Sequence, residues 1–276
     1  LPPEAPKELV DQIKAKYGFD QPLYIQYFTW LGRVAVGDLG NSVFTGEPVR
    51  EQLISALSNT LVLAIPAAVL GFALGIFLGA VAGFNRDTWI DKLASAIAIT
   101  GVSMPHYWGA IVSVILFSVI LNWLPATGMG PSGGLPQSWE DVTHMILPVV
   151  TLSLIPMGVI SRLVRATVLE ITGQEFTAAL RGKGLRRKRI IYHVLKNAAP
   201  PAMALMGLQF GYLLGGSILV ETVYNWPGSG QLMNLAIFRR DIPVLQATVV
   251  VLSFFFVLIN LSVDVLQAAI DPRIRR

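Results

Sequence analysis

The sequence predicts an all-α integral membrane protein, a bundle of five transmembrane helices. Of its 276 residues, 53% are hydrophobic and only 14% are charged, whereas soluble domains carry about a quarter charged residues. Five apolar segments of at least 20 residues are separated by polar loops, and about 20 residues suffice for a helix to cross a bilayer. The five predicted spans are residues 57–84, 93–123, 145–164, 202–224 and 247–270.

Residues 1–56 are mixed and polar, and we expect them to form an external N-terminal segment because they offer too little apolar material for a core of their own. An amphipathic stretch at 8–17 is followed by predicted turns at 37–40 and 46–48. The aromatic residues expected at the membrane interface are Tyr24, Tyr27, Phe28 and Trp30.

Small residues recur every fourth position in two of the predicted spans. This spacing places them on one stripe of a helix, where a second helix backbone can approach closely. We interpret both stripes as helix-packing faces, within this chain or against a second subunit, rather than as a path for a solute. The glycines concerned are Gly71, Gly75, Gly79 and Gly83 in the first stripe, and Gly207, Gly211 and Gly215 in the second.

The segment 93–123 is too long for one plain span and contains Ser103, Met104 and Pro105 near its middle. Proline has no N–H group to continue the helical hydrogen bonds, and it disfavours helical geometry at the residue before it. We therefore expect a kink at this position.

Positive charge indicates the orientation. Fourteen of the 21 Lys and Arg residues lie in residues 85–92, 162–201 and 271–276, whereas residues 124–144 have none. Cytoplasmic loops are enriched in Lys and Arg, so the basic segments are assigned to the cytoplasm and 124–144 to the outside. Five spans with the C-terminus inside leave the N-terminus outside, and we expect a further helix before residue 1.

The segment 170–201 is the most distinctive cytoplasmic stretch. It predicts a short helix over 176–181, a break at 182–184, and a second basic helix over 186–196 that ends at Pro200 and Pro201. One interpretation is a docking element, because a topology signal needs no break between two short helices. The alternative is a basic loop that fixes topology and contacts anionic lipid.

The run TAALRGKGLRRKRIIYHVLKNAAPP resembles the cytoplasmic loop of permease subunits of binding-protein-dependent ABC importers, in the dipeptide/oligopeptide/nickel group. In that family the loop forms a coupling helix that sits in a cleft of the ATPase subunit. The wider superfamily has Glu-Ala-Ala where this chain has Ala178, Ala179 and Leu180, a departure that the peptide group shares. The resemblance assigns the ATPase contact to Glu175, Phe176, Ala179, Leu180, Arg181, Gly182, Lys183, Gly184 and Leu185.

A second stretch, VETVYNWPGSGQLMNLAIFRRDI at 220–242, resembles the family's external loop, with its Pro-Gly-x-Gly turn and short amphipathic helix. The resemblance implies a loop on the binding-protein or pore side; a connector packed on the bundle is the alternative. Residues 57–276 then form the importer's transmembrane domain. The family has six spans, and this sequence resembles everything after the first. The loop residues concerned are Glu221, Trp226, Pro227, Gly228 and Gly230.

The resemblance implies a permease subunit in a bacterial or archaeal cytoplasmic (inner) membrane. With a second homologous permease it would form the path for peptides or a related small solute. Its other partners would be two ABC ATPase subunits, which bind ATP and Mg, and an external substrate-binding protein. The substrate stays open among dipeptides, oligopeptides, glutathione and a nickel chelate. The alternative is a secondary transporter driven by an ion gradient, a class that typically shows internal repeats or clustered intramembrane carboxylates, and we see neither.

No motif for other chemistry stands out. The chain has no nucleotide-binding P-loop and no cysteine, so we predict no catalytic residue and no cofactor of its own. The histidines His106, His144 and His193 are too far apart in the predicted topology for a metal site. The net charge of +4 reflects cytoplasmic loops rather than nucleic-acid binding. We expect Asp264, near the inner end of the last span, to pair with a nearby arginine.

Overall fold

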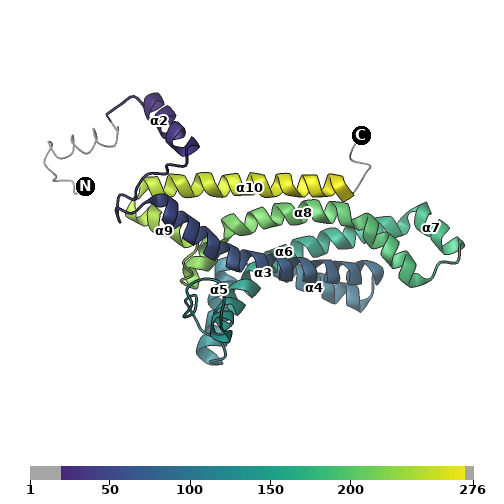
Figure 1. Ribbon diagram of the computed structural model, residues 1–276. Helices are drawn as coiled ribbons and strands as arrows, with labels where there is room; N and C mark the ends of the chain where they lie inside the picture. Colours follow the sequence, from purple (N-terminus) through teal and green to yellow (C-terminus); the bar gives the residue numbers. More distant parts are fainter. Residues whose placement is uncertain (1–19, 271–276) are drawn as a thin grey trace.

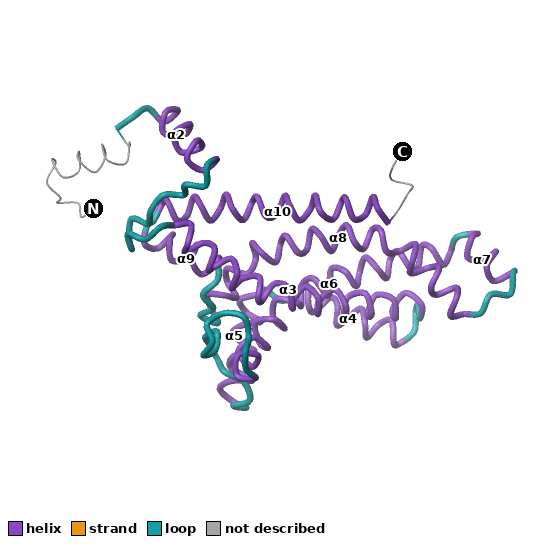
Figure 2. The backbone as a smooth tube through the Cα atoms, in the orientation of Figure 1, coloured by secondary structure: helices purple, strands orange, loops and turns teal. Residues whose placement is uncertain are grey.

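The computed structural model describes residues 20–270, and this part of the chain is helical, with five long helices running alongside one another (Figure 1). Short helices and loops gather at the two ends of this bundle (Figure 2). The five long helices are α3 (Val49–Phe84), α4 (Trp89–Ser103), α6 (Trp139–Gly173), α8 (Arg187–Val223) and α10 (Ile242–Ile270).

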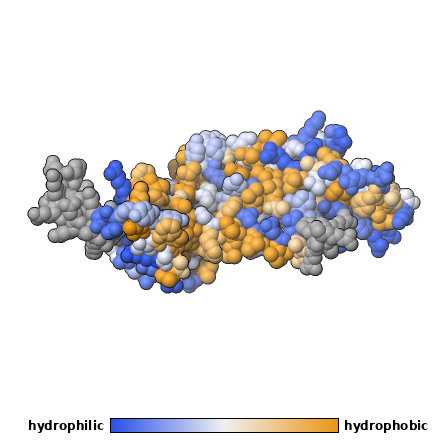
Figure 3. All heavy atoms as spheres, turned by 90° about the horizontal axis from the view of Figure 1, so that it is seen from above, coloured by the Kyte–Doolittle hydropathy of each residue, from blue (hydrophilic) through white to orange (hydrophobic). Residues whose placement is uncertain are grey.

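The two ends of the bundle carry different short helices. Helices α2 (Leu23–Ala35) and α9 (Ser229–Arg239) lie at one end, which we call the outer end, and α7 (Glu175–Gly182) lies at the other, the inner end (Figure 1). Hydrophobic residues cover much of the middle of the face shown in Figure 3, while hydrophilic residues gather toward both ends. This distribution fits a helical bundle that crosses a membrane.

Four of the described helices are long and apolar enough to cross a membrane: α3, α6, α8 and α10. The remaining predicted span, 93–123, is divided into α4 and the pair α5 (His106–Ser113) and η1 (Val114–Ile120), a π-helix. The bend between the two parts is 102°, so the count is five only if this bent pair is one span.

The break falls where the sequence predicts a kink. Met104 adopts an extended conformation, with ψ of 114°, and Pro105 begins α5. A residue before proline avoids the helical region, and the proline nitrogen cannot donate to the preceding turn. The kink is therefore confirmed, although the turn is far sharper than a kinked but continuous span.

One prediction about the inner end is wrong. The basic helix over 186–196 does not end at Pro200 and Pro201, because α8 continues through both prolines to Val223. Prolines are tolerated in membrane helices where neighbouring helices and side chains support the freed backbone groups. Here α8 packs against α6 and α10, and a hydrogen bond from Gln267 Nε2 to the Pro200 carbonyl at 3.3 Å joins α8 to α10 beside the prolines.

The first glycine stripe lies in the most extensive helix contact of the bundle, between α3 and α6. A Cβ atom at Gly75 would lie 2.8 Å from the Met157 carbonyl oxygen, and one at Gly79 would lie 2.5 Å from that of Ser161. Gly71 and Gly83 face α6 in the same way. Glycine therefore lets the two backbones come closer than any other residue would allow.

The second stripe is less uniform. A Cβ at Gly207 would meet Val263, and one at Gly211 would meet Phe256, so both face α10. Gly215 has no atom within 4 Å of such a Cβ and makes no close contact within the described residues.

The N-terminal segment is partly described. The predicted amphipathic stretch 8–17 lies outside the described residues, as do the C-terminal basic residues 271–276. The structure has turns at 36–37 and 43–45, close to the predicted 37–40 and 46–48 but nearer the N-terminus, and α2 has no buried residue. Asp264 is exposed on α10 and joins no ion pair within residues 20–270.

Candidate functional site

Helix α7 projects from the inner end between α6 and α8 (Figure 1). Its anchor is Thr177, which is fully buried and donates a hydrogen bond from Oγ1 to the Ile171 carbonyl at 2.7 Å. This bond ties the first turn of α7 to the last turn of α6. The sequence analysis missed Thr177, a small polar residue between the more conspicuous Phe176 and the two alanines that follow.

One exposed side of α7 is apolar, while Glu175 and Arg181 are exposed as well. Phe176 is 38% exposed and Ala179 is exposed, while Leu180 is half-buried. After the helix, Lys183 N–H donates to the Ala179 carbonyl at 3.0 Å, and Gly184 takes a left-handed conformation with φ of +70°. A β-carbon is disfavoured in that conformation, which explains a glycine at this turn.

The segment 181–189, which runs from the last turn of α7 to the first turn of α8 and which we call the basic linker, is strongly basic. None of its basic side chains joins an ion pair within the part of the chain that the structure describes. α8 also begins without an acidic residue in its first turn and without a side-chain cap. These basic residues are Arg181, Lys183, Arg186, Arg187, Lys188 and Arg189.

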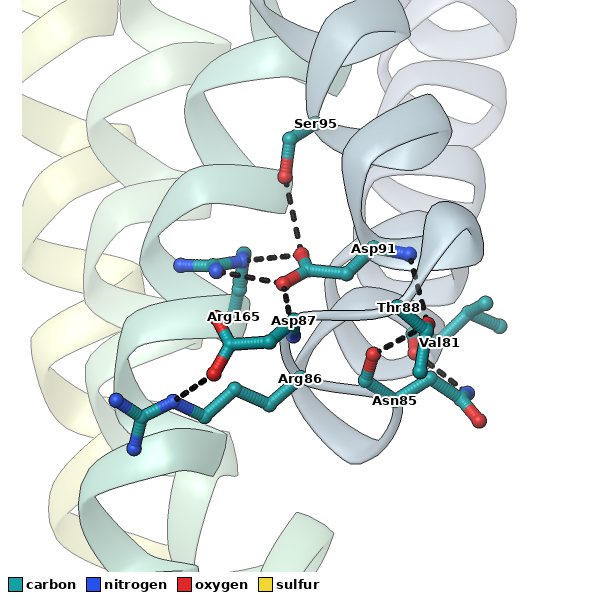
Figure 4. A network of polar contacts seen from close by, with 8 residues as sticks. All are labelled: Val81, Asn85, Arg86, Asp87, Thr88, Asp91, Ser95 and Arg165. Atoms are coloured by element: carbon teal, nitrogen blue, oxygen red, sulfur yellow. Dashed lines mark hydrogen bonds and ion pairs between the residues drawn. The ribbon is translucent and has the colours of Figure 1, made fainter.

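A polar network holds α4 to α6 near the inner end (Figure 4). Arg165 donates from Nε and Nη2 to the two carboxylate oxygens of Asp91, at 2.6 and 2.8 Å. Asp91 is buried and also accepts bonds from the Asp87 N–H and the Ser95 hydroxyl. Sequence reasoning counted Arg165 only as a cytoplasmic charge, because nothing local indicates a partner 74 positions away.

At the outer end, Glu221 is fully buried near the C-terminus of α8. Its carboxylate accepts hydrogen bonds from the Thr60 hydroxyl at 2.8 Å, the Gly230 N–H at 2.7 Å and the Gln231 N–H at 3.1 Å. The last two belong to the first turn of α9, whose N–H groups have no partner inside the helix. Glu221 thus joins α8, α3 and α9.

The Trp-Pro-Gly turn before α9 is clamped to α3. Trp226 is fully buried and donates from Nε1 to the Asn59 carbonyl at 2.9 Å, while Asn59 Nδ2 donates to the Pro227 carbonyl at 2.9 Å. A Cβ at Gly228 would lie 2.5 Å from the Glu221 carboxyl group. Of the predicted loop residues, Glu221, Trp226, Gly228 and Gly230 are buried together, whereas Pro227 is exposed. The cluster leaves one side of α9 facing outward.

The exposed side of α9 carries large apolar side chains: Phe238 is 80% exposed and Ile237 is 52% exposed. The guanidinium of Arg239 lies 4.2 Å from the centre of the Phe44 ring. Asp241, directly after α9, accepts a short hydrogen bond from the Ser42 hydroxyl and bonds from two backbone N–H groups of the same loop. The N-terminal loop and α9 thus form one outer surface.

The two predicted sets of site residues lie at opposite ends of the bundle, and α8 connects them. Tyr224 adds a link that sequence reasoning missed: its hydroxyl lies 2.6 Å from Ser113 Oγ and 3.1 Å from Thr151 Oγ1, joining α8 to α5 and α6. His106 lies close to Gly216 of α8. Within residues 20–270, no group of three or more His, Cys, Asp or Glu is arranged to hold a metal ion.

An all-helical bundle with a short helix held out at one end and a clamped loop at the other fits a membrane subunit of a transport complex. Residues 71–276 match the family described as binding-protein-dependent transport system inner membrane component, and the chain belongs to this family.

Two relatives cover nearly the whole chain. The dipeptide transport system permease protein DppB of Alkalihalophilus pseudofirmus is 36% identical over 291 residues, which include 99% of this chain and 87% of the relative. The glutathione transport system permease protein GsiC of Escherichia coli is 39% identical over 274 residues, with 99% of this chain and 86% of the relative covered.

A solved structure agrees with the fold. An inward-facing conformation of the MetNI methionine ABC transporter superposes with a TM-score of 0.65, at 21% identity, over 80% of this chain and 97% of that one. The protein is a multi-pass inner-membrane permease component of a bacterial ABC importer and is not itself an ATPase. ATPase and binding-protein partners follow from membership of this family.

Proposed function

We propose that this permease pairs with a second homologous permease to form a path for short peptides or glutathione, driven by two ABC ATPase subunits. The relatives named above support the substrate class, since both are named for small peptide-like solutes. The observation that carries the mechanism is α7, a short helix with an exposed apolar face at the inner end of the bundle.

In this proposal, residues 175–185 dock in a cleft of an ATPase subunit. Phe176 and Ala179 supply the apolar contact, with Arg181 and Lys183 as a polar rim. Because Thr177 bonds to the end of α6, a displacement of α7 moves that helix as well. The left-handed turn at Gly184 sets the direction in which the chain returns to α8.

At the outer end, the buried cluster around Glu221 and Trp226 holds α9 in place, and the exposed side of α9 contacts the binding protein. The loop then acts on its partner through α9, while Pro227, Gly228 and Gly230 fix the turn that positions it.

The test uses the complete importer in vesicles, supplied with loaded binding protein and ATP. Ala179→Asp places a charge on the docking face, and Gly184→Val blocks the left-handed turn. We expect either change to lower transport per ATP hydrolysed by about tenfold or more, or to detach the ATPase on purification, because a buried unpaired charge costs several kcal/mol. Arg181→Ala and Lys183→Ala are the controls, since exposed charges contribute about 1 kcal/mol or less.

If both variants keep the same transport per ATP hydrolysed and still co-purify with the ATPase, docking is contradicted. The segment would then be a basic loop that only fixes topology. The same vesicles, supplied in turn with a dipeptide and with glutathione, test the substrate class. Uptake that follows an imposed ion gradient without ATP would favour the secondary transporter instead.

A further inference from the structure

A cavity of about 400 Å³ lies beneath the α7–α8 connection, and we call it the α7–α8 pocket. Its lining comes from the ends of four helices and from the linker between α7 and α8. Its lining residues include four apolar side chains, those of Phe84, Leu185, Ile190 and Ile191, and two arginines, Arg181 and Arg187.

The charge of this pocket is uncompensated. No carboxylate lines it, and within residues 20–270 neither Arg181 nor Arg187 forms an ion pair or donates a side-chain hydrogen bond. Lys183, Arg186 and Lys188 add further positive charge nearby. Two unpaired arginines in the lining of one cavity favour an anionic occupant, and a phosphate matches the donor geometry of a guanidinium group.

The apolar part of the lining indicates that the occupant has a hydrocarbon part. Phe84 and Ile190 pack against the buried cluster that includes Val164, Val168 and Val194, so this wall is continuous with the core of the bundle. A free phosphate would leave this surface uncovered. An amphiphile would cover it and meet the arginines at the same time.

The position of the pocket matches the edge of a membrane. Phe84 is the last residue of α3, a candidate span. Trp89, 72% exposed at the start of α4, and Tyr192, 62% exposed on α8, lie near the same end. Exposed Trp and Tyr are typical of the membrane–water interface.

We propose that the α7–α8 pocket binds one anionic phospholipid of the cytoplasmic leaflet, with its phosphate between Arg181 and Arg187 and its acyl chain against Phe84 and Ile190. The inference goes beyond the proposed transport function and rests on the orientation in which the basic end faces the cytoplasm. Basic pockets between membrane helices on that side suit anionic headgroups.

Arg181 belongs to the rim of the docking segment and follows Phe176 by five residues, which places it about 140° around α7 at about 100° per residue. Arg187 and Ile190 lie on α8, outside the docking segment 175–185. Substitutions at Arg187 and Ile190 therefore test the pocket without changing the docking segment.

The experiment measures how many phosphatidylglycerol molecules the purified complete importer retains in native mass spectrometry, after reconstitution in phosphatidylcholine discs that contain phosphatidylglycerol. Arg187→Gln should lower this retention about fivefold, the change expected from removing one basic group near an anionic surface. Arg187→Lys should restore most of it. Ile190→Trp, which fills the apolar part of the pocket and keeps both arginines, should also lower retention.

The matched control is Arg189→Gln, which removes the same charge about 200° around α8 from Arg187. It should leave retention unchanged. An equal loss in Arg189→Gln would show a diffuse attraction to basic surface and overturn the proposal.

Full competition by inorganic phosphate would indicate a free-anion site and overturn it as well. A third result against it is phosphatidylglycerol bound to the permease pair alone but absent when the ATPase is attached, because the pocket would then belong to the protein partner. If Arg187→Gln loses the lipid while ATP hydrolysis stays coupled to transport, the lipid site is independent of the proposed transport function.

Discussion

At the outer end of the bundle, polar side chains bond to one another across helices, whereas at the inner end most of them face outward. Glu221, Trp226 and Asp241 each join segments far apart in the sequence and are buried. The inner end has the Asp91–Arg165 pair and the Thr177 anchor, beyond which the basic linker has no ion pair within the described residues. The outer end is thus fixed by this chain itself, and the inner end has surface available for partners.

The largest expected loss of stability comes from removing the buried carboxylate of Glu221 at the outer end. Glu221→Leu leaves the N–H groups of Gly230 and Gln231 without their acceptor, whereas the Thr60 hydroxyl keeps the Ala56 carbonyl as an acceptor. Each buried unsatisfied group costs about 1–3 kcal/mol, so we expect stability to fall by about 3–5 kcal/mol. Thermal unfolding of the detergent-solubilised chain measures this change.

The matched control is the same substitution at the inner end. Glu175 is exposed in the first turn of α7, so Glu175→Leu should change stability by about 0.5 kcal/mol or less. Similar losses of stability in Glu221→Leu and Glu175→Leu would contradict the claim that only the outer end is fixed by buried polar contacts.

A smaller effect is expected in the α3–α6 contact, which runs between the two ends. Gly79→Ala places a Cβ 2.5 Å from the Ser161 carbonyl oxygen and 2.8 Å from Val164 Cβ. Overpacking of this kind costs about 1–3 kcal/mol. Gly215→Ala, where nothing lies within 4 Å, is the control and should be neutral or slightly stabilising, because alanine favours a helix over glycine. Equal unfolding temperatures for both variants would contradict close α3–α6 packing.

The smallest effect on stability is expected on the outer surface itself. Phe238 is 80% exposed, so Phe238→Asp should change unfolding by about 0.5 kcal/mol or less. If α9 contacts the binding protein, the same variant should lower the stimulation of ATP hydrolysis by loaded binding protein while basal hydrolysis stays constant. Phe28→Asp on α2, another exposed position, is the control. Equal stimulation in both variants would place the contact elsewhere on the outer end.

Local chemistry predicted much of the fold. The apolar segments are helical, Pro105 breaks its segment, and the short helix before Gly184 is present, because each depends on residues close together in sequence. The long run of α8 through Pro200 was not predictable in this way, since it depends on support from α6 and α10.

The hydrogen-bond partners of the buried polar side chains were the least predictable part of the candidate site. Glu221 was recognised in the external loop, but its acceptor role depends on Thr60, which is 161 positions away. Arg165 and Thr177 gave no signal, because a single arginine or threonine in a helix has many ordinary explanations. The substrate class depends on the relatives rather than on any residue of this chain.

The continuity of α8 has a mechanical consequence. Its 37 residues span about 55 Å at 1.5 Å of rise per residue, from the basic linker to the carboxylate of Glu221. Because neither proline has an N–H group, two consecutive backbone bonds are missing between Lys196 and Pro201. A helix that lacks these two bonds still transmits a displacement along its axis, but it bends more easily at this point. The two halves of α8 can therefore change their angle at Pro200 while each keeps its own end firmly packed.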